Sequence, residues 1–227
     1  MTEQLTRKER ERLRHRQEIL AAARKVFAMR GFKDATIDEI AEKAEFGKAT
    51  LYHYFSTKEE MFQEVMQDGF AQMVELTRKE LDREGTTRKL LLNFGESFLR
   101  HLYENADLFS LYMREMTKVQ SRDCWHIGLR DSVRKLANVL ERSLDLREKK
   151  ERAEMIAFLF IHTVLGIFHF NFIRHCGESQ DAETPLVFAG DERMEEEIGE
   201  AVHLLETIFV RGLDRLLVES KDTETQD

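Results

Sequence analysis

Three histidines and a cysteine in the second half of the chain are the side chains best suited to bind a metal ion. They are His162, His169, His175 and Cys176. A structural zinc site needs about four such ligands gathered around one point. His162 and His169 are separated by about two helical turns, which is too far for joint ligation without a third element. The spacing therefore predicts neither a metal site nor another cofactor.

The sequence also lacks the motifs by which common enzymes hold phosphate or activate a nucleophile. It has no glycine-rich phosphate loop, no nucleophile elbow and no paired His/carboxylate motif at metal-binding spacing. We therefore expect a protein that is not an enzyme. An unusual helical enzyme is the alternative, and it would be distinguished by turnover.

A short segment, residues 48–55, has the spacing of a helix with one buried side. Leu51 and Phe55 are four residues apart and so point together into a core. The other side chains are left on the outward surface, where they combine a cation, methyl groups, a hydroxyl, a phenol and an imidazole: Lys48, Ala49, Thr50, Tyr52 and His53.

Two preceding helices are expected to position this segment. In residues 17–30 the apolar side chains recur at helical spacing from Ile19 to Phe27, and Gly31 is expected to end the helix with a left-handed cap. Thr36 begins the second helix, and Glu39 three residues later completes a capping box. Three short helices with a glycine-containing turn before the third make a helix-turn-helix unit.

The rest of the chain is predicted to be helical as well, so the fold class is all-α. The chain has a single proline and 11 glycines, which are too few turn-forming residues for many short strands. Ser56 or Thr57 is expected to cap a fourth helix that begins at Lys58 and that Gly85 ends. Later helices are expected at residues 87–103, 106–119, 121–144, 148–175 and 192–219, with a loop around Pro185.

Charge is divided unevenly along the chain. The formal net charge is -8, yet residues 5–58 alone carry a balance of +5 and the remainder -13. A basic N-terminal segment followed by an acidic remainder is expected when only the N-terminal end of a protein binds the phosphate backbone of DNA.

The segment 36–62 resembles the DNA-binding signature of the TetR (tetracycline repressor) family. The most specific part is Thr-Leu-Tyr-x-Tyr-Phe-x-x-Lys-Glu-x-Met, from Thr50 to Met61, and Arg-Gly-Phe-x-x-Ala-Thr-Ile before it agrees as well. The match covers residues 17–65. The sequence departs from the pattern at Glu45, where the family usually has glycine, and at Gly47, where a capping serine or threonine is common.

The resemblance implies that the third helix enters the major groove of operator DNA. Its outward residues, Lys48, Ala49, Thr50, Tyr52 and His53, would face bases or the sugar edge. The Lys48 ammonium suits guanine O6 or N7, while methyl groups suit thymine. Thr36, Tyr54 and Lys58 would contact phosphates and so set register rather than sequence. The alternative is that these are ordinary half-buried aromatics and solvated cations.

Residues 1–16 form a basic N-terminal extension. The run Arg7–Arg16 is suited to reach along the minor groove or the DNA backbone. Its interleaved Glu9 and Glu11 equally suit a solvated extension of the first helix with ion pairs four residues apart. Both interpretations stay open at this point.

The C-terminal region is expected to serve dimerisation and ligand binding. One short recognition helix offers few base contacts, so two-fold pairing on a palindromic site is expected. By resemblance, the apolar helix at 155–173 and the last helix would form the interface between two copies. The alternative is that both fill the monomer core.

The family likeness also implies a pocket for a small-molecule inducer among the central helices. Aromatic and methionine side chains there suit an apolar ligand such as a fatty-acyl group, an aromatic compound or a drug. The candidate lining residues are Phe94, Phe98, Phe109, Tyr112, Met113, Met116, Trp125, Phe158 and His162. Side chains at this spacing are also typical of plain core.

The predicted organisation is a basic extension (1–16), a DNA-binding domain (17–60), a helical ligand-binding and dimerisation domain (61–219) and a disordered tail (220–227). The charged N-terminus predicts no secretory signal, and polar residues interrupt the most apolar stretch, so we expect a cytoplasmic protein without a membrane span. The function expected is a ligand-released transcriptional repressor. The alternative is a helical partner-binding module without specific DNA binding.

Overall fold

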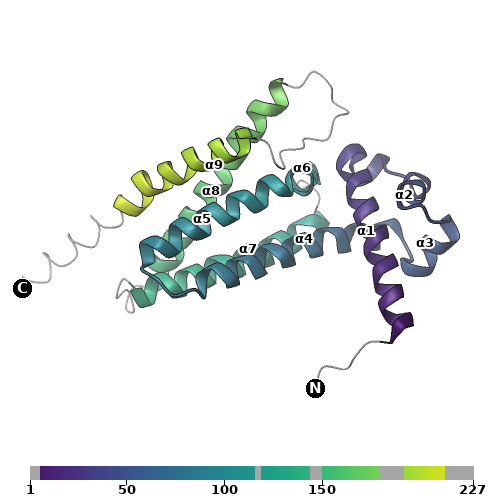
Figure 1. The fold of residues 1–227 in the computed structure, drawn as a ribbon, viewed down its shortest axis with the longest axis horizontal. Coiled ribbons are helices and arrows are strands. Elements are labelled where there is room, and N and C mark those ends of the chain that lie inside the picture. Colours follow the sequence, from purple (N-terminus) through teal and green to yellow (C-terminus); the bar gives the residue numbers. More distant parts are fainter. Residues whose placement is uncertain (1–5, 116–118, 144–149, 179–191, 213–227) are drawn as a thin grey trace, which may run out of the picture. The chain divides into compact units, whose positions relative to one another are not determined.

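Every element in the part of the chain that the structure describes is a helix (Figure 1), as the all-α prediction required. The structure is a computed structural model and describes residues 6–115, 119–143, 150–178 and 192–212. The chain divides into two compact units. Unit 1 comprises Met1–Phe70, Asp107–Cys124 and Glu183–Leu186, and unit 2 comprises Ala71–Ala106, Trp125–Ala182 and Val187–Asp227.

Unit 1 is built on one long helix. Its elements are α1 (Arg7–Asp34), α2 (Ile37–Ala44), α3 (Lys48–Tyr54), the first half of α4 (Lys58–Leu81) and most of α6 (Ala106–Glu115). Helix α1 begins well before the predicted Gln17, because Thr6 and Glu9 form a capping box at its start. Gly31 interrupts α1 as expected, with φ 78° and ψ 167°, but the helix resumes for one turn as far as Asp34.

Helix α4 begins where the sequence predicted and ends earlier. Thr57 caps it by accepting a hydrogen bond from the Glu60 amide at 3.0 Å. It ends at Leu81 rather than at Gly85, since the chain needs a turn before Thr86, which caps the following helix. The glycine lies inside that turn and does not itself stop the helix.

Unit 2 packs helices from the middle and the end of the chain. They are the second half of α4, α5 (Thr87–Glu104), α7 (Val119–Ser143) from Trp125 onward, α8 (Lys150–Glu178), α9 (Glu192–Leu204) and the π-helical segment η1 (Leu205–Val210). Gly95 of α5 allows the closest approach, because a Cβ there would lie 2.9 Å from Leu205 Cδ1 and 3.3 Å from the Phe160 ring. The last helix was predicted as one regular helix to residue 219, and the π turn was not foreseen. Leu216 and the predicted tail lie outside the described residues.

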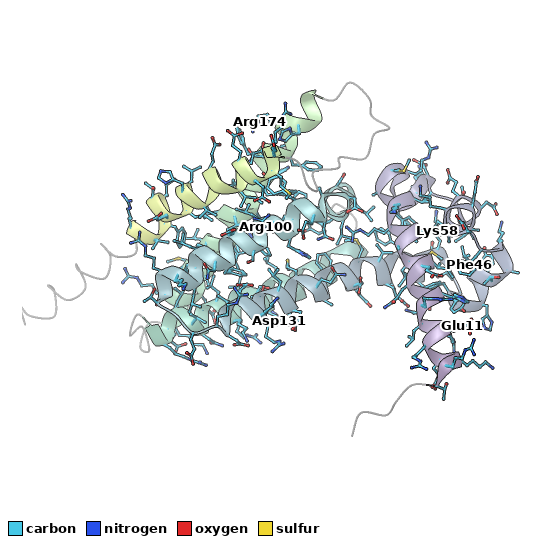
Figure 2. The ribbon with its side chains drawn as sticks, in the orientation of Figure 1. Glu11, Phe46, Lys58, Arg100, Asp131 and Arg174 are labelled. Carbon is cyan, nitrogen blue, oxygen red and sulfur yellow. The ribbon has the colours of Figure 1, made fainter. Side chains whose placement is uncertain are left out.

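A buried carboxylate joins three helices of unit 2. Glu197 on α9 accepts hydrogen bonds from the Tyr103 hydroxyl (2.7 Å), Arg174 (2.7 Å) and His175 Nε2 (2.6 Å). Asn171 on α8 in turn donates to the Tyr103 hydroxyl at 2.9 Å. Figure 2 labels Arg174, the solvent-facing member of the group. The network therefore ties α5, α8 and α9 together through groups that would be costly to bury alone.

One face of α8 is exposed among the described residues of unit 2. The helix is long and apolar enough to cross a membrane by length and composition alone, with mean hydropathy 1.9, and 44% of its apolar window is buried. The exposed apolar residues on α8 are Met155, Phe158, Leu159, Phe170 and Ile173, and those on the last helix are Leu204 and Ile208.

Candidate nucleic-acid interface

A small apolar core holds α3 against α1 and α2. Ile19 and Phe27 of α1, Ile40 of α2, and Leu51 and Phe55 at α3 each expose at most 2% of their surface. Leu51 and Phe55 are thus buried together, as their four-residue spacing predicted. Since burial of such side chains is worth about 1.5–3 kcal/mol each, the position of α3 is well determined by packing.

The start of α2 is closed by its own side chains. The Thr36 hydroxyl accepts from the Glu39 amide at 3.2 Å and donates to the Glu39 carboxylate at 2.9 Å, as in the predicted capping box. The Thr36 amide donates to the same carboxylate at 2.9 Å. A phosphate at this helix start would therefore have to displace Glu39 before Thr36 could donate to it.

The turn between α2 and α3 contains a strained residue. Glu45 has φ 59° and ψ 31°, which is the left-handed region, and it is the only residue other than glycine with positive φ in the described chain. Gly47 then caps α3 in an extended conformation without a side-chain hydrogen bond. The two departures from the family pattern thus lie on either side of Phe46.

Replacing Glu45 with glycine is expected to stabilise unit 1. A left-handed conformation costs a residue with a Cβ about 1–2 kcal/mol, and the greater freedom of glycine in the unfolded chain offsets part of that gain. The net expectation is about 0.5–1 kcal/mol, or roughly 1–4 °C in Tm. Thermal unfolding followed by circular dichroism measures this. Glu42→Gly, inside α2, is the matched control and should lower Tm; a lower Tm for Glu45→Gly as well would contradict the strain.

Helix α3 presents a largely exposed surface in the described part of unit 1. Ala49, Tyr52 and His53 are exposed, Tyr52 to 51%, while Thr50 is half-buried. Lys48, at the start of the helix, is exposed as well. Four of the five predicted base-facing residues are therefore exposed on α3, and the fifth, Thr50, is half-buried.

Lys48 is held by an acidic neighbour on α2. Its ammonium lies 2.9 Å and 3.1 Å from the two carboxylate oxygens of Asp38. The hydrogen bond to Asp38 raises the pKa of Lys48 above its ordinary value. The side chain therefore stays charged at neutral pH and is directed by Asp38 rather than free in solvent.

Tyr54 is supported by a histidine that the sequence interpretation did not single out. His15 Nδ1 lies 3.3 Å from the Tyr54 hydroxyl, and the His15 ring packs edge-on against Phe46 at 5.1 Å. Arg16 next to it lies 4.8 Å above the Phe55 ring and pairs with Glu64. Helical spacing could have identified His15, because it lies four residues before the buried Ile19 and so on the same side of α1.

Lys58, which was predicted to contact phosphate, also makes contacts within unit 1. Its ammonium donates to the backbone carbonyls of Ala35 (2.8 Å) and Lys33 (3.2 Å) at the end of α1. It also lies 4.8 Å from the centre of the Phe32 ring. Two of the three ammonium donors are thus used inside unit 1, where they satisfy carbonyls that the helix end leaves free.

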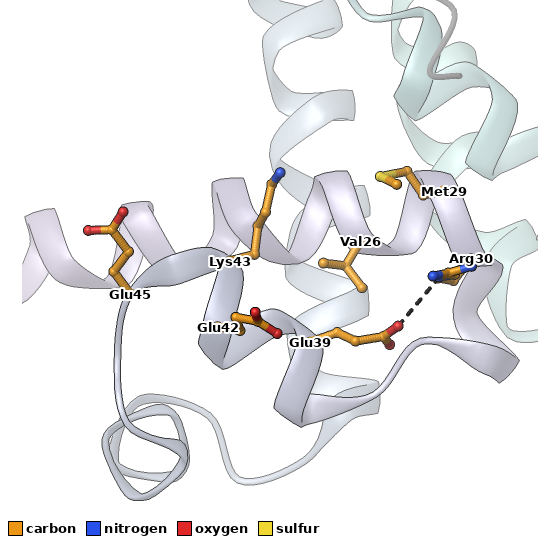
Figure 3. A pocket seen from close by; sticks show the side chains of 7 residues that line it. All are labelled: Val26, Met29, Arg30, Glu39, Glu42, Lys43 and Glu45. Atoms are coloured by element: carbon orange, nitrogen blue, oxygen red, sulfur yellow. Dashed lines mark ion pairs between the residues drawn. The ribbon is translucent and has the colours of Figure 1, made fainter. Parts of the chain in front are cut away.

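A shallow hollow lies beside α1 and α2 but does not suit either predicted partner. Figure 3 shows its lining, which contains Glu39, Glu42 and Glu45 beside Arg30 and Lys43, with a volume of about 450 Å³. Arg30 and Glu39 form an ion pair across it at 3.4 Å. Three carboxylates would repel a phosphate backbone, and the charged lining does not match an apolar inducer.

The predicted inducer-binding residues are divided between the two units. Phe94 and Phe98 are fully buried in unit 2 with their ring centres 5.5 Å apart, whereas Phe109 and Tyr112 are buried in unit 1. The side chains of Met113, Met116 and Trp125 lie outside the described residues.

Phe158 and His162, two further residues of the predicted lining, lie together on α8. Their rings stack on each other, 3.7 Å between centres, and Phe158 exposes 47% of its surface on α8. The pattern of this apolar stretch did not show which of its side chains face away from the core.

Known proteins share both the DNA-binding region and the whole fold. Residues 19–65 match the family model described as bacterial regulatory proteins, tetR family. The uncharacterised HTH-type transcriptional regulator YdgC of Bacillus subtilis is 29% identical over 141 residues. Those residues are 59% of this chain and 66% of YdgC, so the chain spans just under two thirds of that relative.

Solved structures extend the likeness along the chain. A TetR-like transcriptional regulator from Rhodococcus sp. RHA1 is 29% identical with a TM-score of 0.61, covering 93% of this chain and 99% of that one. The transcriptional regulator FadR from Bacillus subtilis, in complex with stearoyl-CoA, is 16% identical with a TM-score of 0.63, covering 83% and 96%. Residues 19–65 therefore carry the DNA-binding region of bacterial regulatory proteins of the tetR family, and the all-helical fold of the chain is similar to that of a TetR-like regulator.

Proposed function

We propose that this protein is a cytoplasmic transcriptional repressor that binds a palindromic operator as a homodimer and is released by a small apolar ligand. The observation that carries the proposal is the outward face of α3, which exposes Tyr52, His53 and Ala49 while Leu51 and Phe55 hold the helix against the core of the domain. Exposed aromatic and polar side chains on the third helix of a helix-turn-helix are what base recognition in the major groove requires.

The chemistry of α3 suits mixed-sequence DNA. The Lys48 ammonium would donate to guanine O6 or N7, and Ala49 and the Thr50 methyl would contact thymine methyl groups. Asp38 orients Lys48 before binding and would have to yield it to the base, since the two are paired in the free protein. Tyr54, held by His15, would direct its hydroxyl to a phosphate.

The exposed stripe on α8 supports dimerisation. Met155, Leu159, Gly166, Phe170 and Ile173 recur at intervals of three, four or seven residues and so share one side of the helix. A Cβ at Gly166 would meet nothing within 4 Å, so this position is open to a partner helix. Leu204 and Ile208 of the last helix supply a second strip of exposed apolar surface. A contiguous apolar surface of this kind marks an interface with a partner.

Replacing Phe170 with glutamate is expected to convert the dimer into a monomer. Phe170 exposes 67% of its surface in the single chain, so the change costs the monomer little, whereas a carboxylate buried between two copies would be strongly unfavourable. Analytical ultracentrifugation at micromolar concentration measures the outcome. Phe170→Leu, which keeps the surface apolar, should remain dimeric, and a dimeric Phe170→Glu variant would place the interface elsewhere.

A fatty-acyl ligand is the inducer class that we favour. The structure of FadR from Bacillus subtilis was solved in complex with stearoyl-CoA. The interior of unit 2 in this chain is rich in phenylalanine: the Phe94 ring lies 6.2 Å from the Phe160 ring, which contacts Phe209 at 5.1 Å. An acyl chain would displace such apolar contacts with little loss of free energy. Binding would then alter α4, which contributes residues to both units, and shift the population away from the DNA-binding state.

Operator selection followed by fluorescence anisotropy tests the proposal. Duplexes selected from random DNA should converge on a palindrome that binds two chains per site in excess nonspecific competitor. Addition of stearoyl-CoA should weaken that complex. Failure to select any sequence would favour the alternative, a helical partner-binding module. Unchanged operator affinity at saturating stearoyl-CoA would exclude this ligand as the inducer and leave DNA binding intact.

A further inference from the structure

The first two turns of α1 project beyond the domain that they belong to. The helix begins at Arg7, but its first fully buried side chain is Ile19, and residues 7–14 are all exposed. In Figure 1 this end of α1 runs past α2 and α3, and Figure 2 labels Glu11 on it. We call residues 7–14 the overhang.

The overhang is a formed helix rather than an extended arm. The Thr6 amide donates to the Glu9 carboxylate at 2.7 Å, and the Glu9 amide donates to the Thr6 hydroxyl at 3.3 Å. Hydrogen bonds from Thr6 lower the pKa of Glu9 below its ordinary value, so the carboxylate stays ionised and keeps the cap closed at neutral pH. The side chains of the overhang therefore have fixed directions relative to the rest of α1.

The side of α1 that faces the core continues along the overhang, where its residues are exposed. Moving back from the buried Ile19 in steps of three and four residues reaches His15, Arg12 and Lys8. His15 is half-buried against Phe46 and Tyr54, whereas Arg12 and Lys8 are fully exposed. These two cations thus point toward the side of α1 on which α2 and α3 lie, one to two turns past the end of α3.

Neither cation is neutralised within the described part of the chain. Arg14 pairs with Glu18 at 3.6 Å and Arg16 pairs with Glu64, but no ion pair joins Lys8 or Arg12 to a carboxylate there. The overhang contains two acidic residues: Glu9 is committed to the helix cap, and no ion pair joins Glu11 to Lys8 or Arg12 within the described residues. The inward side of the overhang therefore carries two uncompensated positive charges at fixed positions.

We propose that the overhang is a second DNA contact, in which Lys8 and Arg12 bind phosphates beside the groove that α3 enters. This inference rests on the proposed function and adds a positioning element to it. His15 fixes the geometry by joining α1 to Tyr54 at the end of α3. At 1.5 Å per residue, Arg12 lies about 4.5 Å and Lys8 about 10.5 Å beyond His15 along the helix axis.

Phosphate is the partner that this arrangement fits best. A preformed helix cannot follow the floor of the narrow minor groove as an extended arm would, but it can lie along a backbone. Because its helix forms without DNA, little ordering cost is left to oppose binding. Contacts of this kind add affinity at every sequence equally and make binding more sensitive to salt.

The test compares two doubly substituted variants that lose the same charge. Lys8→Gln/Arg12→Gln removes the inward cations, and Arg7→Gln/Arg10→Gln removes two from the opposite side of the same helix turns. Glutamine, lysine and arginine have similar helix propensities, so α1 should persist in both variants. Anisotropy over a salt series is measured with a duplex of arbitrary sequence and with the selected operator.

The inward variant should reduce the slope of log K against log salt on both duplexes. Each lost phosphate contact is worth about 0.9 in slope, hence about 3.6 for two cations in each of two chains. The opposite-side variant should change the slope by less than half as much. Equal slopes for the two variants would overturn the inference while leaving site-specific binding intact. A reduced slope on arbitrary DNA without a selectable operator would instead support the inference and contradict the proposed repressor.

Discussion

Replacing Tyr52 with alanine is expected to lower operator affinity by roughly 30-fold to more than 10⁴-fold without destabilising the protein. Each base-reading contact is worth about 1–3 kcal/mol, and a two-fold complex loses two of them, about 2–6 kcal/mol in all. Tyr52 exposes 51% of its surface on α3 and belongs to no core cluster. Its removal should therefore leave the thermal unfolding curve almost unchanged while anisotropy shows the loss of binding.

Met29→Ala is the matched control for Tyr52→Ala. Met29 lies on α1 in the same unit and exposes 46% of its surface, but it lies away from the outward face of α3. Its variant should bind the operator like the unchanged protein. If Tyr52→Ala also bound normally, the face of α3 could not be the reading surface. If both variants lost operator binding and also unfolded at lower temperature, the loss of binding would be a consequence of reduced stability.

Replacing Glu197 with alanine is expected to cost unit 2 about 3 kcal/mol of stability. Removal of one partner from a buried charged network typically costs 3–5 kcal/mol. The lower end applies here because Arg174 exposes about half of its side chain and can turn to solvent once unpaired. His175 and the Tyr103 hydroxyl, by contrast, would lose a short hydrogen bond with little access to water. The expected fall in Tm is about 6–12 °C.

At acid pH, the free energy of unfolding of the Glu197→Ala variant should lie closer to that of the unchanged protein. Burial alone would raise the pKa of Glu197, but hydrogen bonds from Tyr103, His175 and Arg174 outweigh it and hold the pKa below its ordinary value. A carboxylate whose pKa is lowered by folding contributes stability that is fully present above the unfolded value, about 4.3, and that is lost as pH falls through the folded value. Urea unfolding at pH 7 and below pH 4 measures the difference in free energy of unfolding between the two proteins at each pH.

Glu196→Ala separates the network from general effects of charge. Glu196 adjoins Glu197 on α9, is exposed, and carries the same charge. Its removal should change stability by less than about 0.5 kcal/mol at either pH, as for most surface substitutions. Equal losses for the two variants would show that the network around Glu197 contributes no more than its surface neighbour.

Local chemistry explains why much of the DNA-binding region could be predicted from sequence. The pair Thr36 and Glu39 forms its capping box within one helical turn, so no distant contact was needed to anticipate it. Leu51 and Phe55 likewise share a helix side by spacing alone, and both are buried. The family signature then identified the surface that they leave exposed.

Features that depend on long-range packing were missed. The contacts of the Lys58 ammonium with the carbonyls of Lys33 and Ala35 were not foreseen, because nothing nearby in sequence indicates them. Phe158 was assigned to a pocket because a helix that is apolar on nearly every side does not reveal which side faces a core. The three donors to Glu197 come from α5 and α8, whose proximity to α9 arises only in the folded unit.

The π turn in the last helix bears on how related chains can differ in length. Leu205 and Val210 are both buried although five positions separate them, since a π turn accommodates one residue more than an α turn. A relative that lacks any one residue between 205 and 210 would close the same helix with ordinary α geometry and bury the same two side chains. A one-residue gap at this point in a comparison of sequences is thus compatible with an unchanged core.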